Sequence, residues 1–203
     1  LEAKFNIEIA QDRIKEKQKQ KKPTYGGTSI TKLRSSYKTL SISQVQYMSY
    51  FSISKNVDWG FYGHSTINHS YGQKSIIGDR VVIDHSTGLM WHRSGSDTGM
   101  AWNEAKQWVK DLNSRGYAGY SDWRLPTVEE AASLLESGER NGDLYIDVFS
   151  SKQTWIWTGD RKSGSGVPGA WSVTYFSARF HMGGVFWYGV GNYIYVRPVR
   201  SVE

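Results

Sequence analysis

The sequence predicts an α+β fold in which two amphipathic helices precede a series of short antiparallel strands, with a helical extension at the N-terminus. Apolar residues recur at helical spacing between residues 102 and 112. Residues 127–130 (TVEE) have the pattern of a helix capping box, with Thr127 as the N-cap. Beyond Gly138, β-branched and aromatic segments alternate with Gly-rich turns. Helices followed by a run of such strands are typical of an α+β domain.

The individual elements follow from the same patterns. One helix is predicted at residues 102–113, before Gly116, and a second at residues 127–135. The motif Trp123-Arg124-Leu125 precedes the second helix. Alternation sends Trp123 and Leu125 into the core, and we expect Arg124 to contact backbone carbonyls or a carboxylate. Strands are predicted at residues 80–84, 89–91, 154–157, 170–176, 179–182, 185–188 and 193–200.

The chain divides into three parts. Residues 1–23 are rich in charge, free of Gly and Pro before Pro23, and carry apolar residues four apart, which predicts a helix or coiled coil able to self-associate. Residues 24–75 are predicted to be a linker and an irregular segment that packs on the domain through aromatic side chains such as Trp59 and Phe61. Residues 76–203 form the compact domain. A short helix is an option at residues 43–48. The sequence lacks a starting Met and a signal-peptide pattern, which is what a piece of a longer protein would show.

Composition limits the classes of function. The 203 residues include 9 Trp, 13 Tyr and 21 Gly, which favours both an aromatic β-rich core and an aromatic recognition surface. The absence of cysteine excludes disulfides, thiolate nucleophiles and Cys-ligated zinc. The net charge of +6 is concentrated at residues 13–22, which is typical of a solvated helix face or tail, with nucleic-acid or anionic-membrane contact as the alternative. The remainder is nearly balanced, so we expect no nucleic-acid partner, and no apolar run is long enough to span a membrane.

No pattern of residues indicates catalysis. The five histidines, at positions 64, 69, 85, 92 and 181, lack the spacing of metal ligands on a helix, and surface or structural roles are expected for them. Asp84 and His85 could form a dyad, but no nucleophile accompanies them. Hydrolase and phosphate-loop motifs are absent. We therefore expect a protein that is not an enzyme and that has no cofactor and no metal.

The window at residues 172–193 is the candidate binding region. It holds seven aromatic residues and no Asp, Glu, Lys or Gln. A β-rich core could use several of these aromatics, but strand alternation cannot bury neighbours such as Phe186, Trp187 and Tyr188 together. Exposed aromatics among Gly, Ser and Asn have the composition of a paratope. We expect Trp187 to be buried and the following residues to form an exposed ligand-binding face: Tyr175, Ser177, Arg179, His181, Gly184, Phe186, Tyr188, Gly191, Asn192 and Tyr193.

Four ordered blocks of sequence resemble the Lcl C-terminal domain family. They are VVIDHSTGLMW from residue 81, DWRLPTVEE from residue 122, WIWTGD from residue 155 and YVRPVR from residue 195, within a match from about residue 76 to 201. The resemblance implies a C-type-lectin-like fold, in the variant shared with formylglycine-generating enzymes. The enzyme branch needs cysteines, which this chain lacks, and the calcium-site strings of sugar-binding animal lectins are also missing.

The family also includes variable proteins of diversity-generating retroelements, in which adenine positions near the 3′ end of the gene are rewritten. Randomising the adenines of an Asn codon reaches every residue type in the 172–193 window except Met182 and Trp187. The resemblance therefore implies a diversified binding module with a macromolecular ligand, a protein or a cell-surface target, displayed on a cell surface, outside the cell or on a virion. The alternative is a fixed-sequence interaction or sensing module of the same family, appended to another domain.

Overall fold

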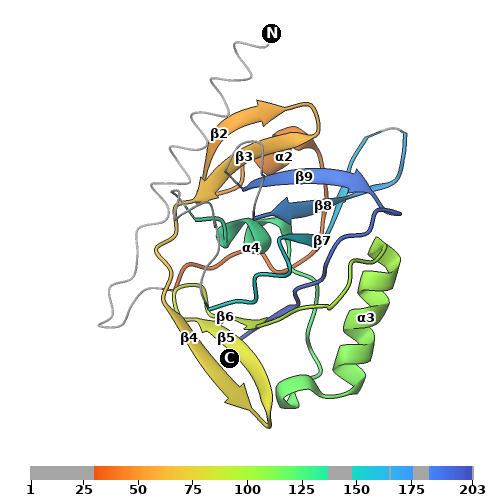
Figure 1. Ribbon diagram of the computed structural model, residues 1–203. Helices are drawn as coiled ribbons and strands as arrows, with labels where there is room; N and C mark the ends of the chain where they lie inside the picture. Colours follow the sequence, from red (N-terminus) through yellow and green to blue (C-terminus); the bar gives the residue numbers. More distant parts are fainter. Residues whose placement is uncertain (1–29, 137–147, 165, 176–182, 203) are drawn as a thin grey trace. The chain divides into compact units, whose positions relative to one another are not determined.

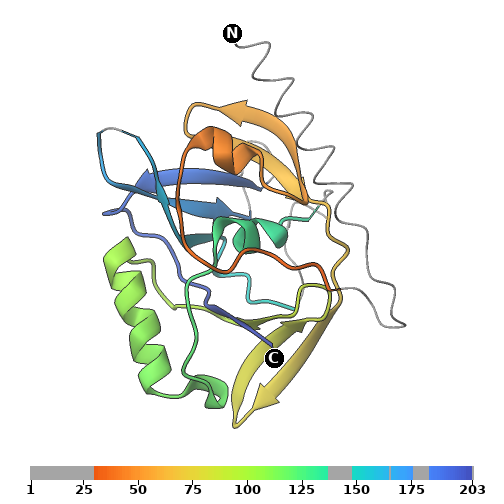
Figure 2. The same ribbon diagram turned by 180° about the vertical axis from the view of Figure 1, so that it is seen from behind.

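The computed structural model describes residues 30–136, 148–164, 166–175 and 183–202 (Figures 1 and 2). Within it, Thr31–Glu203 forms a compact unit of helices and two sheets made mostly of antiparallel strands. The predicted α+β class is confirmed in this form, with more strand than helix among the described residues. The extension predicted at residues 1–23 and the strand predicted at residues 179–182 lie outside the described residues.

In the described part of the chain, the larger sheet has six strands in the order β1-β7-β8-β9-β3-β2. All neighbours are antiparallel except β1 and β7, which pair in parallel. The strands are β1 (Thr39–Leu40), β2 (Phe51–Val57), β3 (Gly60–Ser65), β7 (Trp155–Lys162), β8 (Gly169–Thr174) and β9 (Gly184–Gly189).

The smaller sheet, again among the described residues, is antiparallel, with four strands in the order β10-β6-β5-β4. Its strands are β4 (Tyr71–Ile76), β5 (Asp79–Asp84), β6 (Leu89–His92) and β10 (Val199–Ser201). The strands predicted at 80–84 and 89–91 are confirmed as β5 and β6. The strand predicted at residues 193–200 is regular only in β10, and before it the chain makes isolated bridges, Met100 with Ile194 and Ile156 with Tyr195.

The two predicted helices are present. α3 (Trp102–Ser114) is followed by the 3-10 turn η1 (Tyr117–Gly119), and α4 (Val128–Ser133) begins after Thr127. The Thr127 side chain accepts a hydrogen bond from the backbone N–H of Glu130, so the capping box is confirmed. α4 ends earlier than predicted, with Leu134 as its C-cap. The optional helix at residues 43–48 is α2 (Ile42–Gln46).

Helices α3 and α4 pack in separate cores. The residues of α4 lie in one cluster with Phe61, Val173 and Val185, which share a face of the larger sheet. A second cluster joins the apolar side of α3 to Trp123 and Leu125, both 2% exposed as predicted. β5 separates the clusters, because alternate side chains of this strand enter one or the other. Residues 81–84 of β5 are therefore buried on both faces.

Residues 40–73 are not the irregular segment that the sequence predicted. They form α2 and the β2–β3 hairpin, and β3 joins the larger sheet by pairing with β9. The sequence pattern was weak because β2 alternates poorly and turns into β3 at Asp58-Trp59. Phe61 is fully buried, but Trp59, which was also expected to pack on the domain, is 49% exposed at this turn.

Candidate functional site

A group of half-buried and exposed side chains lies at the start of β7, at the end of β9 and in the turn after β9. We call this group the aromatic surface, and its members are Trp155, Tyr188, Val190, Asn192 and Tyr193. The rings of Trp155 and Tyr188 meet edge to face, with 4.4 Å between their centroids. Tyr193 is 75% exposed. None of the five members carries a charge at neutral pH, so the surface presents aromatic, apolar and amide groups only.

Strand register explains why Tyr188 and Trp155 meet. Tyr188 lies opposite Ala170 of β8, on the face of the sheet that points away from α4. Trp155 lies on the same face of β7, and its indole extends across β8, where Nε1 donates to Ser172 Oγ at 2.9 Å. The small Ala170 side chain leaves the space above β8 to the two rings. Burial raises the pKa of Tyr188, and the nearby Tyr62 contributes.

Backbone hydrogen bonds hold the turn that carries the other members. Asn192 N–H and the Asn192 side-chain amide both donate to Gly189 O, at 3.0 and 2.9 Å. Val190 N–H donates to Pro168 O, and Val190 O accepts from Trp102 N–H at the start of α3. Met100 and Ile194 pair directly after the turn. Asn192 and Tyr193 therefore project into solvent from a fixed backbone, which reduces the entropy lost on binding.

The structure corrects the predicted binding face at three positions. Tyr175 is 5% exposed and its hydroxyl donates to Ala131 O, and Phe186 is 3% exposed against the ring of Tyr62. Gly184 is buried where a Cβ would lie 2.6 Å from Phe61 O. At Gly184 and Phe186 the prediction of exposure was wrong because β3, which supplies Phe61 and Tyr62, was not recognised as a strand of the sheet. At Tyr175 it was wrong because this residue packs against α4.

The remaining predicted residues fall into two groups. Tyr188, Gly191, Asn192 and Tyr193 are partly or fully exposed, as predicted, while Ser177, Arg179 and His181 lie outside the described residues.

Trp187, expected to be buried, is half-buried, and Lys162 Nζ lies 4.7 Å from its ring centroid on the opposite face of the sheet. Trp155 was missed as a surface residue. Its place directly after Thr154 at the start of a predicted strand gave no indication of the face it would occupy.

The histidine and carboxylate that do pair are not the sequence neighbours Asp84 and His85. Asp84 contacts His69, with 2.7 Å between Oδ2 and Nδ1, and His69 Nε2 lies 2.7 Å from Ser133 O. Burial acts to raise the pKa of Asp84, but hydrogen bonds from His69, Thr87 and Ser86 outweigh it and lower the pKa. Through these hydrogen bonds the cluster connects the segment before β4 with β5 and α4.

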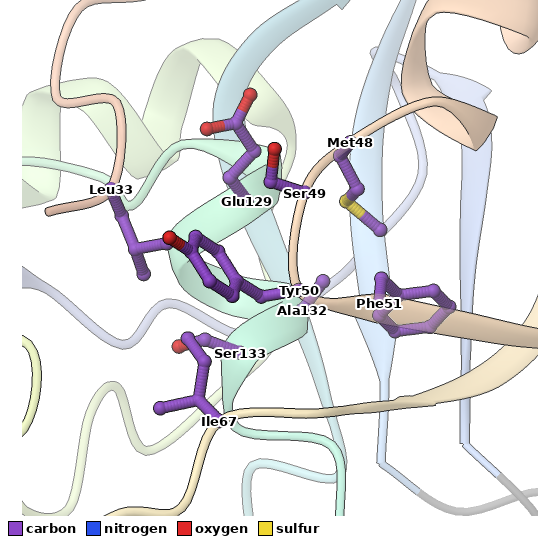
Figure 3. Close-up of a pocket in the computed structure, with 9 residues that line it drawn as sticks. All are labelled: Leu33, Met48, Ser49, Tyr50, Phe51, Ile67, Glu129, Ala132 and Ser133. Carbon is purple, nitrogen blue, oxygen red and sulfur yellow. The ribbon is translucent and has the colours of Figure 1, made fainter. Parts of the chain in front are cut away.

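Figure 3 shows a hollow between the segment before β1, the start of β2 and α4, with a cavity volume of about 0 Å³. Small-molecule sites usually enclose about 300–1,000 Å³, so this hollow is too small for such a ligand. Among the described residues, no group of three or more His, Asp or Glu side chains could hold a metal ion. The residues that line the hollow in Figure 3 are Leu33, Met48, Ser49, Tyr50, Phe51, Ile67, Glu129, Ala132 and Ser133.

Comparison with known proteins agrees with the four sequence blocks. The model of the Lcl C-terminal domain matches residues 80–200, a stretch that runs from the second residue of β5 through most of β10 and includes all of the aromatic surface. No curated protein and no solved structure matches the chain. No helix in the described part of the chain is long and apolar enough to cross a membrane. Because the family match covers more than half of the sequence, the chain belongs to the Lcl C-terminal domain family.

Proposed function

We propose that this domain is a binding module, not an enzyme, and that the aromatic surface is where its macromolecular ligand docks. The observation that carries the proposal is the combination of a 75% exposed Tyr193 with the Trp155–Tyr188 pair on a hydrogen-bonded backbone. Exposed Tyr and Trp are the side chains that most often dominate binding energy at protein interfaces. Their rigid presentation limits the ordering cost of association.

The surface favours a protein or a cell-surface target over a small molecule or nucleic acid. Its members lie on a half-buried part of a sheet face and on an exposed turn, an arrangement that suits contact over area. None of them is cationic, so the surface itself supplies no phosphate contacts of the kind that dominate nucleic-acid binding. The proposal includes display of the domain at a cell surface, outside the cell or on a virion, because a protein or cell-surface target is accessible in those places.

The finer form of the proposal is a C-type-lectin-like scaffold whose exposed C-terminal positions are diversified by a retroelement. Tyr188, Asn192 and Tyr193 are all residue types reachable from an Asn codon by changes at adenines, and their side chains are at least partly exposed. Tyr175 and Phe186 are equally reachable but buried, so folding would restrict variation there. A reverse-transcriptase gene beside a near-copy of the 3′ coding segment, differing at adenines, would establish diversification, and its absence would favour the fixed-sequence module.

The binding role is tested by truncating aromatic side chains at two places, the aromatic surface and the β2–β3 turn. The labelled full chain is titrated onto panels of immobilised proteins, glycans and intact cells, and the best target is used for variants. Tyr188→Ala and Tyr193→Ala should each weaken binding at least about tenfold, the loss expected for a central aromatic residue. Trp59→Ala is the matched control, because Trp59 is an exposed aromatic residue of the same sheet outside the aromatic surface.

The melting temperature of each variant is measured alongside to show that it folds. The proposal is overturned if the two Tyr variants bind as tightly as the unaltered chain while Trp59→Ala loses binding. That result would place the ligand at the β2–β3 turn.

A further inference from the structure

The β4–β5 hairpin ends in a turn whose first residue breaks a local rule. The turn consists of Ile77 and Gly78, both in left-handed conformation with φ of 51° and 87°. Asn-Gly or Asp-Gly is the usual sequence for such a two-residue turn, because a β-branched residue at positive φ is strained. Ile77 is also 84% exposed, more than any other large hydrophobic residue in the described ranges. Neither local conformation nor burial accounts for an isoleucine here.

The surroundings of the tip are basic. Lys74 and Arg80 on the hairpin are exposed, and so is Arg115, which lies just before η1. The turn η1 itself contacts both β4 and β5. Within the described residues, none of these three cations has an ion-pair partner. The carboxylates of this end are engaged, since Asp79 accepts from Ala118 N–H at 2.7 Å and Asp122 pairs with Arg200.

An aromatic residue of η1 lies against the hairpin. Tyr117 of η1 is half-buried, and its hydroxyl donates to Arg80 O. A Cβ on Gly119, two residues on, would lie 3.1 Å from Ile77 Cδ1, so the isoleucine rests beside η1 without being covered by it. An apolar apex, an amphipathic aromatic residue and unpaired cations behind them are the side chains of an interfacial membrane contact.

The geometry points to the β4–β5 tip as a docking point on an anionic phospholipid surface. Ile77 enters the boundary between headgroups and acyl chains, and Lys74, Arg80 and Arg115 lie at the level of the lipid phosphates. A lipid surface is favoured over an acidic protein because a single protruding side chain needs no preformed socket in a fluid bilayer. In Figures 1 and 2 the tip lies at the opposite end of the domain from the loop before β8, so a domain held at Ile77 leaves the aromatic surface free.

A fluorophore at the tip tests this directly, because the chain has no cysteine and an introduced one is unique. The full chain carrying Ile77→Cys is labelled with the environment-sensitive dye NBD and mixed with phosphatidylglycerol vesicles. The emission should shift to the blue and gain at least about twofold in intensity, as the dye leaves water. Phosphatidylcholine vesicles and soluble glycerophosphoglycerol should produce no shift, which separates insertion from contact with a free headgroup.

Val167→Cys provides the matched control, because Val167 is a 71% exposed apolar residue in the loop before β8. Its label should stay in water with every vesicle. This comparison also removes any contribution of the basic run at residues 13–22, which both labelled chains share. A shift at Val167 with none at Ile77 would overturn the proposal, and so would the absence of a shift at both sites.

Ile77→Asn separates binding from folding. Asn accepts the left-handed conformation, so this variant should melt at the same temperature as the unaltered chain or higher. Co-sedimentation with phosphatidylglycerol vesicles should nevertheless fall at least about threefold at limiting lipid, whereas Val167→Asn should leave it unchanged. Equal co-sedimentation of the two variants would contradict insertion at Ile77. The test is independent of the proposed ligand site, since Tyr193→Ala should not alter the vesicle result.

Discussion

His92 illustrates how the environment of one residue sets its chemistry. Its Nδ1 accepts a hydrogen bond from Gly95 N–H at 2.8 Å, and its ring stacks on Tyr117 with 4.1 Å between centroids. Burial is the main cause that lowers the pKa of His92 to about 4, and the charge of Arg197 adds to it. The residue is therefore neutral in the folded protein at physiological pH.

This shift predicts a pH dependence of stability. The unfolded state binds a proton at His92 below its ordinary pKa of about 6.5, while the folded state stays neutral down to about pH 4. The free energy of unfolding should therefore fall as the pH drops from 6.5 to 4, by an amount on the order of 3 kcal/mol. Urea unfolding across this range measures it.

His92→Gln is the control, because its side-chain oxygen retains an acceptor for Gly95 N–H and does not titrate. The unfolding free energy of the unaltered chain minus that of His92→Gln should decrease as the pH falls from 6.5 to 4. A difference that stays constant from pH 7 to pH 4 would show that His92 does not cause the loss.

At the scale of elements, the segment before β1 is part of the domain and not a linker. Arg34 makes a bidentate ion pair with the fully buried Asp160 of β7, at 2.8 and 2.7 Å, and contacts Glu129 of α4. Asp160 also accepts from Lys38 N–H and from Val128 N–H in the first turn of α4. One carboxylate thus joins the N-terminal segment, a strand of the larger sheet and a helix.

Arg34→Met should destabilise the domain by about 3 kcal/mol, because removing one partner leaves a buried carboxylate without its counter-ion. The change is measured as a lower urea midpoint with an unaltered slope. Lys152→Met is the matched control, since the Lys152–Asp97 pair is exposed and 3.7 Å long, and we expect no measurable change from it. Similar midpoints for both variants would mean that the Arg34 pair contributes little.

At the scale of the whole molecule, the core includes strands from before the family match. β3 pairs with β9, the strand that ends in the aromatic surface, and Phe61 lies fully buried between the sheet and α4. Val45 of α2 belongs to the same cluster. The aromatic surface therefore rests on a sheet whose far strands come from the first third of the chain.

A chain that begins at Ile76 should fail to unfold cooperatively, because it lacks β2, β3 and β4 and exposes the cluster around α4. A chain that begins at Ile30 keeps all described elements and should retain a single sharp transition. Thermal unfolding followed by circular dichroism distinguishes the two. A sharp transition in the shorter chain would show that residues before the family match are dispensable for folding.

Local patterns in the sequence were sufficient for several elements. Apolar spacing located α3, and the capping box located the start of α4 at Thr127. Alternation around Arg124 predicted the burial of Trp123 and Leu125, and Arg124 pairs with Glu130 as one of the two expected kinds of partner. These features depend on residues within a few positions of one another, so the sequence by itself determined them.

Tertiary structure decided which face of each strand meets solvent. Tyr175 and Phe186 were predicted to be exposed on the same grounds as Tyr188, but β3 and α4 cover them and leave Tyr188 half-buried beside Trp155. Alternation states only that neighbouring side chains point to opposite faces. Which face is buried depends on distant partners, Ala131 at 44 residues from Tyr175 and Tyr62 at more than a hundred from Phe186, and the sequence contains no local record of that pairing.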